Sequence, residues 1–148
     1  MAPAETSIAV KVLSVGFHPD DHIALGDVLK GQEPPHCANC RFEVTAADGV
    51  EGALRVLKND RIPIVLSECE LGKDTWKTLL ARLEQLEDPP FLIVGSRLAD
   101  EFLWAEALNL GAYDVLTQPF RATEVVRTLG LAWLRWSKAQ GRRRVAVA

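Results

Sequence analysis

The stretch IPIVLSECELG, residues 62–72, contains the strand that decides the expected fold, and two acids follow that strand directly. Residues 64–66 form an unbroken apolar run, which is typical of a strand buried on both faces of a sheet. Glu68 and Glu70 follow at the end of that strand. Parallel sheets bind their ligands outside the carboxyl ends of the strands, so Glu68 is expected at the mouth of a candidate site.

The rest of the chain alternates between apolar strand-like segments and amphipathic helical ones. The expected strands cover residues 8–15, 41–47, 62–68, 91–95 and 113–116, and the expected helices lie near residues 19–31, 48–57, 74–86, 100–111 and 123–137. This alternation indicates a parallel sheet covered on both faces, with right-handed crossovers. The predicted class is α/β: a flavodoxin-like, doubly wound five-stranded parallel sheet of order 2-1-3-4-5 with five helices.

Several helix ends carry recognisable signals. Asp48, Asp74 and Asp100 stand where a side chain can accept hydrogen bonds from the first free backbone N–H groups of a helix. Gly111 stands where a helix can end in the left-handed conformation that glycine tolerates. These residues predict the starts of the second, third and fourth helices and the end of the fourth.

Length and composition predict a single domain. The chain has 148 residues, of which 48% are hydrophobic and 25% are charged, as is usual for a soluble globular chain. The predicted layout is an N-terminal tail at residues 1–7, one domain at residues 8–137 and a basic C-terminal tail at residues 138–148.

Charge and apolar-run length exclude several classes of partner. A formal net charge of −3 does not suit a nucleic-acid-binding surface, and the arginines at residues 142–144 are expected to be solvated. The apolar runs are too short for a membrane span, and residues 1–7 lack the pattern of a secretory signal. We therefore expect a cytoplasmic protein with neither nucleic-acid nor membrane partners.

Three cysteines, Cys37, Cys40 and Cys69, give an odd count in a chain without a secretory signal. This usage favours reduced thiols over a disulfide framework. Cys69 lies just past a buried strand and is expected to be a small packed residue, not a nucleophile.

His36, Cys37 and Cys40 resemble half of a zinc site. Zinc usually takes four ligands, and His18 and His22 belong to the opposite end of the first expected helix. We therefore expect no metal site within one chain, although a site shared between two chains stays open. The cysteine pair also does not open a helix, as a thioredoxin-type redox motif does.

The expected strand ends gather the candidate site residues. They comprise a glycine and an aromatic after the first strand, an acid after the third, a hydroxyl after the fourth, and an amide and a proline after the fifth. In that order, the residues are Gly16, Phe17, Glu68, Ser96, Gln118 and Pro119.

These positions carry a family resemblance. GAYDVLTQPF, residues 111–120, resembles the end of a response-regulator receiver domain, whose usual pattern is G-A-x-x-Y-L-x-K-P-F. VLSECELG, residues 65–72, is similar to the phosphoacceptor strand and loop of that family, with Glu68 at the aspartate position. Ser96 falls where receivers carry a serine or threonine. The resemblance extends over about residues 8–137 and implies a signalling domain.

The chain also departs from the receiver pattern. Receivers hold Mg²⁺ with an acid pair after the first strand, where this chain has Gly16 and Phe17. The lysine position holds Gln118, and the aromatic switch position holds Val115. Glu68 alone cannot hold Mg²⁺ well, and a glutamine brings no positive charge to a phosphoryl group. We therefore expect weak or absent Mg²⁺ binding and no phosphorylation of Glu68.

Two roles for Glu68 stay open at this stage. Its charge could point toward Ser96 and mimic a phosphorylated aspartate, or it could simply be an acid tolerated at a solvent-accessible strand end. A shifted metal site is a further alternative. Asp20 and Asp21, which suit the first turn of a helix, would supply its acids, more so if Glu70 turned inward.

The sequence is interpreted as an atypical receiver, a pseudo-receiver of two-component or phosphorelay signalling that acts through protein–protein interaction and not as an enzyme. Its expected partner or homodimer surface is the fourth helix, fifth strand and fifth helix. Trp104 and Trp136 would contribute there unless they pack on the domain itself. The alternatives are a conventional phosphorylatable regulator with a rebuilt acid site and a flavodoxin-like small-ligand-binding domain.

Overall fold

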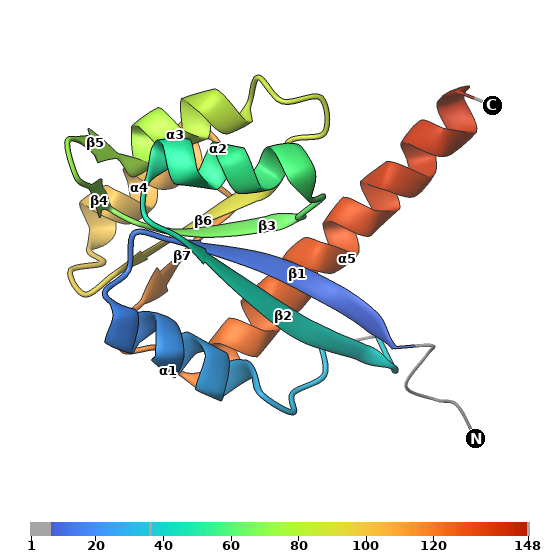
Figure 1. Ribbon diagram of the computed structural model, residues 1–148, viewed down its shortest axis with the longest axis horizontal. Helices are drawn as coiled ribbons and strands as arrows, with labels where there is room; N and C mark the ends of the chain where they lie inside the picture. Colours follow the sequence, from blue (N-terminus) through green and yellow to red (C-terminus); the bar gives the residue numbers. More distant parts are fainter. Residues whose placement is uncertain (1–6, 36, 148) are drawn as a thin grey trace.

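A computed structural model describes residues 7–35 and 37–147, with side chains described as far as Gly141. Figure 1 shows three layers, in which a central sheet separates two groups of helices. Along the described residues the helices are α1 (Pro19–Leu29), α2 (Val50–Asn59), α3 (Trp76–Leu83), α4 (Glu101–Leu110) and α5 (Ala122–Val147). The strands of the central sheet are β1 (Ile8–Val15), β2 (Cys40–Ala47), β3 (Ile64–Glu68), β6 (Phe91–Ser96) and β7 (Asp114–Thr117).

The central sheet has the order β2-β1-β3-β6-β7, and all of its strand pairs are parallel. This is the order 2-1-3-4-5 that the alternation of segments predicts, so the flavodoxin-like fold class is confirmed. The first strand also has the predicted bounds. Apolar runs at the centre of the sheet allow only an arrangement in which helices cover both faces.

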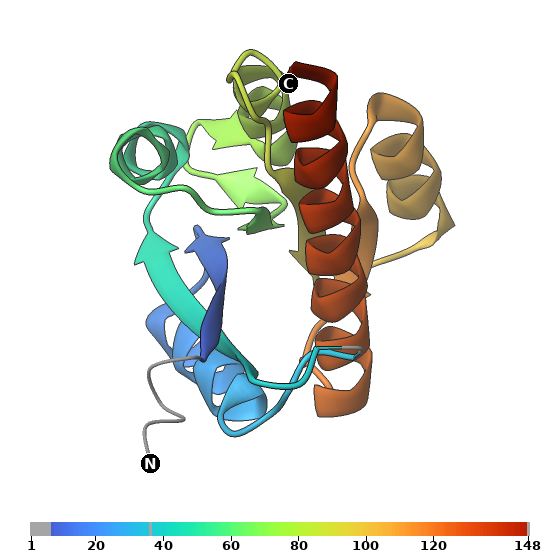
Figure 2. The same cartoon turned by 90° about the vertical axis from the view of Figure 1, so that its right-hand side faces the viewer.

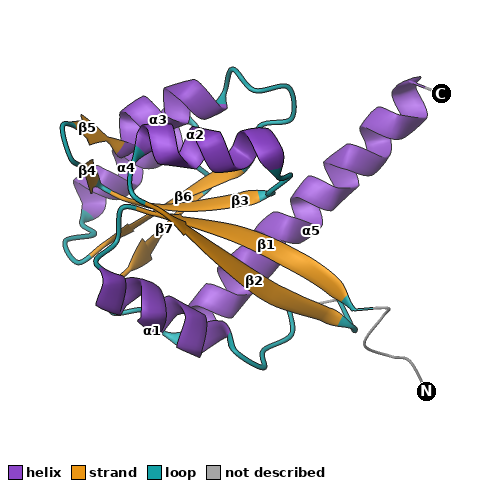
Figure 3. Ribbon diagram, viewed as in Figure 1, coloured by secondary structure: helices purple, strands orange, loops and turns teal. Residues whose placement is uncertain are grey.

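The core has two parts, one on each face of the sheet. On one face, β-strand residues pack with α2, α3 and α4; on the other, they pack with α1 and α5. Figure 3 shows these two helix layers above and below the strands. Val65 of β3 belongs to the first part, whereas its neighbours Ile64 and Leu66 belong to the second. All three side chains are fully buried, which is why their run is apolar without interruption.

A second, smaller sheet follows β3 and was not predicted. It is an antiparallel ribbon of β4 (Glu70–Leu71) and β5 (Asp74–Thr75), with Gly72 in a left-handed turn between them. Asp74 therefore lies in β5, and the prediction that it caps α3 is wrong. Thr75 is the cap, because its side chain accepts a hydrogen bond from Lys77 N at 3.2 Å.

Of the other predicted helix ends, those of α4 are confirmed and the start of α2 is wrong. Asp100 caps α4 by accepting a hydrogen bond from Leu103 N at 2.9 Å, and Gly111 ends this helix with a φ of 110°, as predicted. The capping box at Asp48 is wrong, because Gly49 takes the cap position of α2 without a side-chain hydrogen bond.

The last helix is longer than the sequence predicts. Residues 138–147, which were expected to form a tail, continue α5 as far as Val147. Lysine, alanine, glutamine and arginine in this stretch are strong helix formers, so helical structure can continue past the sheet. Figure 2 shows α5 running along the molecule to the C-terminal end. None of the helices in the described part of the chain is both long and apolar enough to cross a membrane.

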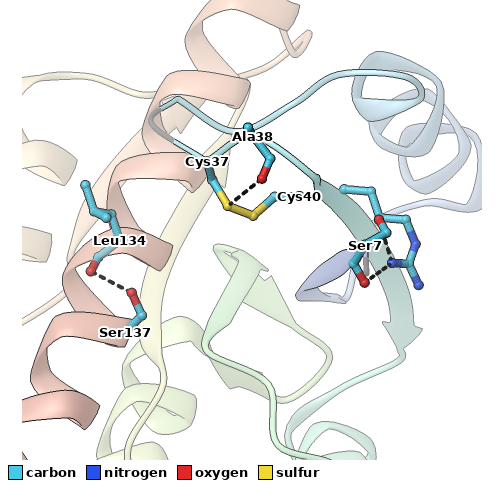
Figure 4. Close-up of a disulfide and its surroundings, with 7 residues drawn as sticks. Ser7, Cys37, Ala38, Cys40, Leu134 and Ser137 are labelled. Carbon is cyan, nitrogen blue, oxygen red and sulfur yellow. Dashed lines mark hydrogen bonds between the residues drawn. A yellow bond between two sulfur atoms is a disulfide. The ribbon is translucent and has the colours of Figure 1, made fainter. Parts of the chain in front are cut away.

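Cys37 and Cys40 are joined in a disulfide, which corrects the expectation of reduced thiols for this pair (Figure 4). The turn before β2 brings their Cα atoms to 5.6 Å, a separation that a disulfide can span. Cys69 is a free thiol.

Gly130 in α5 lies against the loop between α1 and β2. A Cβ atom added at Gly130 would collide with the ring of Pro35 and approach its backbone nitrogen to 3.2 Å. Glycine weakens a helix interior, so its presence here is explained by this close approach. The loop is thereby seated directly on α5.

We predict that Gly130→Ala lowers the free energy of unfolding by about 1–3 kcal/mol, because the ring of Pro35 cannot move aside as a flexible side chain could. Gly26→Ala in α1 is the matched control. A Cβ atom there meets nothing within 4 Å, so this variant should gain about 0.5–1 kcal/mol from the better helix former. Urea denaturation measures both, and equal or greater stability of Gly130→Ala would contradict the steric explanation.

Candidate functional site

The carboxyl ends of the central strands bring the predicted site residues to one edge of the sheet. Glu68 pairs in register with Gly95, and Ser96 pairs with Thr117, the last residue before Gln118. In Figure 1 this edge lies on the left, beside the β4–β5 ribbon and the start of α1. The structure therefore brings these residues to one edge of the sheet, at the ends of β3, β6 and β7.

Two aromatic side chains fill the centre of this edge. Phe17 and Phe120 form an edge-to-face pair, with ring centroids 5.6 Å apart and planes at 73°. Both rings lie over Gly95, where a Cβ atom would come within 3.0 Å of Phe17 and 3.4 Å of Phe120. Glycine in β6 thus allows the two rings to settle on the sheet. Two partly buried aromatic rings therefore occupy this part of the edge.

The position before Phe17 is equally unsuited to an acid. Gly16 has a left-handed backbone with a φ of 80°, which strains other residues. A Cβ atom there would collide with the Leu71 side chain, which is buried beneath the ribbon. The ribbon therefore closes over the end of β1. The two positions after β1 thus lie against apolar side chains, Gly16 against Leu71 and Phe17 against Phe120.

Glu68 remains at the end of β3 as a half-buried carboxyl. Its Oε1 accepts a hydrogen bond from Cys69 N at 2.9 Å. Burial raises the pKa of Glu68, while the Cys69 N–H partly lowers it. Among the nearby charges, Asp21 raises this pKa and Arg97 lowers it. The carboxyl is thus held locally and is costly to ionise.

An ion pair crosses the edge beside Glu68 and was not predicted. Arg97, which follows β6, places its Nη2 2.6 Å from Oδ1 of Asp21 on α1. Asp21 is therefore engaged with a cation of the chain. Asp20 is exposed and lies 3.6 Å from His18 Nδ1, and Glu70 is exposed on β4. The structure does not bring these acids together with Glu68 into a shifted metal site.

Ser96 and Gln118 are both buried at the strand ends. Ser96 Oγ accepts a hydrogen bond from Leu98 N at 3.0 Å, so part of its hydrogen-bonding capacity is satisfied within its own turn. The Oε1 atom of Gln118 is buried and has no hydrogen-bond partner among the described residues. The peptide bond between Gln118 and Pro119 is cis, and Pro119 is exposed.

Cys69 is a poor candidate for a nucleophile. Burial raises the pKa of the Cys69 thiol, and a hydrogen bond with Ser96 only partly offsets this. The thiolate is the reactive form of cysteine, so a raised pKa suppresses reactivity near neutral pH. The prediction of a packed, unreactive residue is consistent with this environment.

Within residues 7–35 and 37–141, no group of three or more His, Cys, Asp or Glu side chains is placed to hold a metal ion. His36, part of the half zinc site considered above, lies outside the described residues. Cys37 and Cys40 are bonded to each other, and His18 and His22 lie at the start of α1.

The two tryptophans proposed for an interface have different environments. Trp104 on α4 is 39% exposed. Trp136 on α5 is partly buried beneath Arg61, whose guanidinium carbon lies 5.0 Å from the ring centroid. Arg61 is itself held by Asp88 at 3.3 Å and by Gln140. Trp104 is therefore available at the surface, whereas Trp136 packs within the domain.

Sequence reasoning missed three contributors to this edge: Phe120 as the partner of Phe17, Leu71 beneath Gly16, and the Arg97–Asp21 pair. Arg97 could have been noticed, because it directly follows a predicted strand end. The other contacts join segments that are far apart in sequence, and no local pattern indicates them.

Comparisons with known proteins show which sequences the chain is similar to. No protein-family model matches the chain. The chain is 26% identical over 113 residues to the regulatory protein VirG of Agrobacterium fabrum, covering 76% of this chain and 43% of that protein. It is 28% identical over 108 residues to the two-component response regulator-like protein APRR3 of Arabidopsis thaliana, covering 70% of this chain and 22% of that protein. The chain therefore spans less than half the length of these relatives.

A solved structure with the same architecture is the signal receiver domain of an HD domain-containing protein from Pseudomonas fluorescens Pf-5. Its TM-score is 0.75 at 23% identity, over 89% of this chain and 92% of that one. The sheet order and this likeness show that the chain has the fold of receiver domains. Among curated proteins, it is similar in sequence to response regulators.

Glu68→Gln should stabilise the protein increasingly as the pH rises. A carboxyl whose pKa is raised by folding binds more protons in the folded state than in the unfolded state. Its contribution to stability is therefore fully present below the unfolded-state pKa. As the pH rises through the folded-state pKa, that contribution is lost, whereas the amide does not titrate. The amide keeps an acceptor for Cys69 N and carries no charge. We expect the stability difference between Glu68→Gln and the wild type to grow between about pH 3 and about pH 7.

Chemical denaturation across that pH range measures the difference. Glu70→Gln controls for the removal of one negative charge nearby, since Glu70 is exposed on β4. A difference for Glu68→Gln that stays constant or shrinks as the pH rises would contradict the assignment of a costly, half-buried charge.

Proposed function

We propose that this domain is an atypical receiver of two-component-type signalling, which acts through protein contacts and is not phosphorylated at Glu68. The observation that carries the proposal is the Phe17–Phe120 pair over Gly95. These rings occupy the space beside the phosphoacceptor-equivalent position. The receiver fold and the sequence similarity to response regulators support the signalling role.

The chemistry of phosphoryl transfer supports the second half of the proposal. Such a site needs a carboxylate nucleophile, a hard cation held by oxygen ligands and positive charge for the transferring group. Among the described strand ends, Glu68 supplies a carboxylate, while the positive charge of Arg97 is already paired with Asp21. Gly16 and Phe17 offer no oxygen ligands from their side chains, and Gln118 offers no charge.

The two roles of Glu68 that the sequence leaves open can now be weighed. The hydrogen bond that holds its carboxylate comes from Cys69 N, on its own strand end. Ser96 Oγ instead accepts a hydrogen bond from Leu98 N. This arrangement favours a locally held acid over a mimic of a phosphorylated aspartate that engages Ser96.

The two alternative functions have less support at this edge. A rebuilt acid site would need Asp21, which is paired with Arg97 at 2.6 Å. A small ligand at the strand ends would have to displace the aromatic pair. A groove of about 490 Å³, lined in part by Leu83, Phe91 and Trp136, lies at the amino-terminal start of β6, away from these strand ends.

The surface of α4 is the best candidate for a protein contact. Its exposed apolar side chains include Phe102, which is 86% exposed, Leu108, which is 49% exposed, and Trp104. Only Ala107 of this helix is fully buried. Large apolar side chains gathered on one helix mark an interaction surface more often than scattered single ones do. We therefore propose α4, with β7 and α5, as the surface for a partner or for a second copy of the chain.

Incubation with acetyl phosphate and Mg²⁺ should leave the intact mass of the protein unchanged. The matched variant Glu68→Asp restores the usual nucleophile but not the missing metal ligands or lysine, so we expect no adduct for it either. A stable adduct on the wild type that disappears in Glu68→Ala would contradict the proposal, while an adduct on Glu68→Asp alone would show that the aromatic pair does not block the site.

Phe102→Asp should weaken self-association by about tenfold or more, because a charge would be placed in an apolar contact. Ile23→Asp on α1 is the matched control, since Ile23 is 59% exposed on the other helix layer. Light scattering over a concentration series measures both variants and the wild type. A wild type that stays monomeric throughout, or an equal effect of Ile23→Asp, would contradict a homodimer through α4.

A further inference from the structure

The Cys37–Cys40 disulfide lies at the end of the sheet opposite to the candidate site. It closes the turn that leads into β2, at the amino-terminal edge of the strands (Figure 4). Asn39 within the turn has a left-handed backbone with a φ of 67°, and Cys37 N donates a hydrogen bond to Pro34 O at 3.3 Å. The proposed signalling role uses neither cysteine.

The two sulfur atoms differ in exposure. Cys40 is 3% exposed and belongs to the core beneath the sheet, whereas Cys37 is only partly buried at its margin. A thiolate must reach one sulfur of a disulfide along the S–S axis while the other sulfur departs. This difference makes Cys37 the sulfur that a reagent can reach and Cys40 the leaving group.

The ring that the disulfide closes is very small. Cys37 and Cys40 are three residues apart, and the loss of chain entropy on cross-linking is smallest for short loops. The bridge therefore restrains the turn locally and is not needed to hold distant segments together. Such a bond can open without unfolding the sheet.

We propose that Cys37 and Cys40 form a reversible thiol–disulfide exchange site whose substrate is a small or protein dithiol reductant. A reductant thiolate attacks Cys37 Sγ, forming a mixed disulfide and releasing Cys40 as a thiolate, which then takes up a proton. The second thiolate of the reductant attacks the reductant's sulfur in the mixed disulfide and releases Cys37. Two electrons pass to the protein, and the reductant leaves as its own disulfide.

Opening the bridge changes contacts on two sides of the turn. The carbonyl of Asn39 accepts a hydrogen bond from the backbone N–H of Ile8 at 2.8 Å. Ile8 is the first residue of β1. The preceding loop rests on α5 where Pro35 meets Gly130. Reduction frees the turn between these two contacts. The redox state of the cysteine pair therefore affects the start of β1 and the contact between the loop and α5. This inference is independent of the proposed signalling role.

The test is a redox titration of the full chain in mixtures of reduced and oxidised glutathione, with acid quenching, alkylation and intact mass. Glutathione is a monothiol, so one molecule forms the mixed disulfide with Cys37 and a second attacks the glutathione sulfur, releasing Cys37 and leaving as oxidised glutathione. We expect one two-electron transition in which two additional cysteines become alkylated on reduction. Cys69→Ser is the control and should leave the transition unchanged, because Cys69 lies on the other side of the fold. A pair that stays reduced in fully oxidised glutathione, or that resists excess dithiothreitol without denaturant, overturns the proposal.

Single variants test the assigned roles. Cys40→Ser leaves the accessible Cys37 thiol and should form a mixed disulfide with oxidised glutathione about tenfold faster than Cys37→Ser does. Circular dichroism confirms that each variant folds, and the wild-type titration stands without them. Equal rates would overturn the assignment of Cys37 as the attacked sulfur.

Hydrogen exchange tests the structural consequence. The Ile8 amide should exchange several-fold faster in the reduced protein, while amides in the middle of β3 should not change. Identical Ile8 exchange in both redox states would overturn the coupling between the bridge and the start of β1.

Discussion

The burial of β3 on both faces is the constraint on which the rest of the structure depends. Val65 faces α2, α3 and α4, whereas Ile64 and Leu66 face α1 and α5. Burial of apolar surface on both sides is the main favourable term that holds the layers together. Because β3 pairs with β1 on one side and β6 on the other, its position also aligns the ends of the neighbouring strands. The location of the candidate site follows from this packing.

At that edge, apolar packing replaces the parts that a charged reaction centre would require. The Phe17–Phe120 pair lies on Gly95, and an edge-to-face aromatic pair contributes about 0.5–1.5 kcal/mol beyond its burial. At the end of β3, burial also raises the pKa of Glu68, because the charged carboxylate loses contact with water. An apolar contact and a charged carboxylate place opposing demands on such an edge, because the first excludes the water that the second needs.

The long helix α5 connects features that lie far apart in the chain. Pro35 of the disulfide-containing loop rests on Gly130, and Arg61, which precedes β3, stacks on Trp136 further along α5. On the same helix, Leu129 and Ala132 are buried against the sheet. A change in the loop therefore acts on α5, which is also part of the proposed partner surface. This continuity comes from packing along one rigid element.

The sequence by itself determined the features that depend on local patterns. Apolar runs and helical periodicity defined the alternation of strands and helices that indicates the flavodoxin-like class, and they gave the bounds of β1. Asp100 and Gly111 marked the ends of α4, and Glu68 was placed at a strand end. Only the tertiary structure decided which distant groups meet: the aromatic pair, the Arg97–Asp21 ion pair, the ribbon over Gly16 and the bridge between Cys37 and Cys40. Periodicity and capping act within a few residues of the chain, whereas these contacts depend on crossovers, register and the exact path of loops.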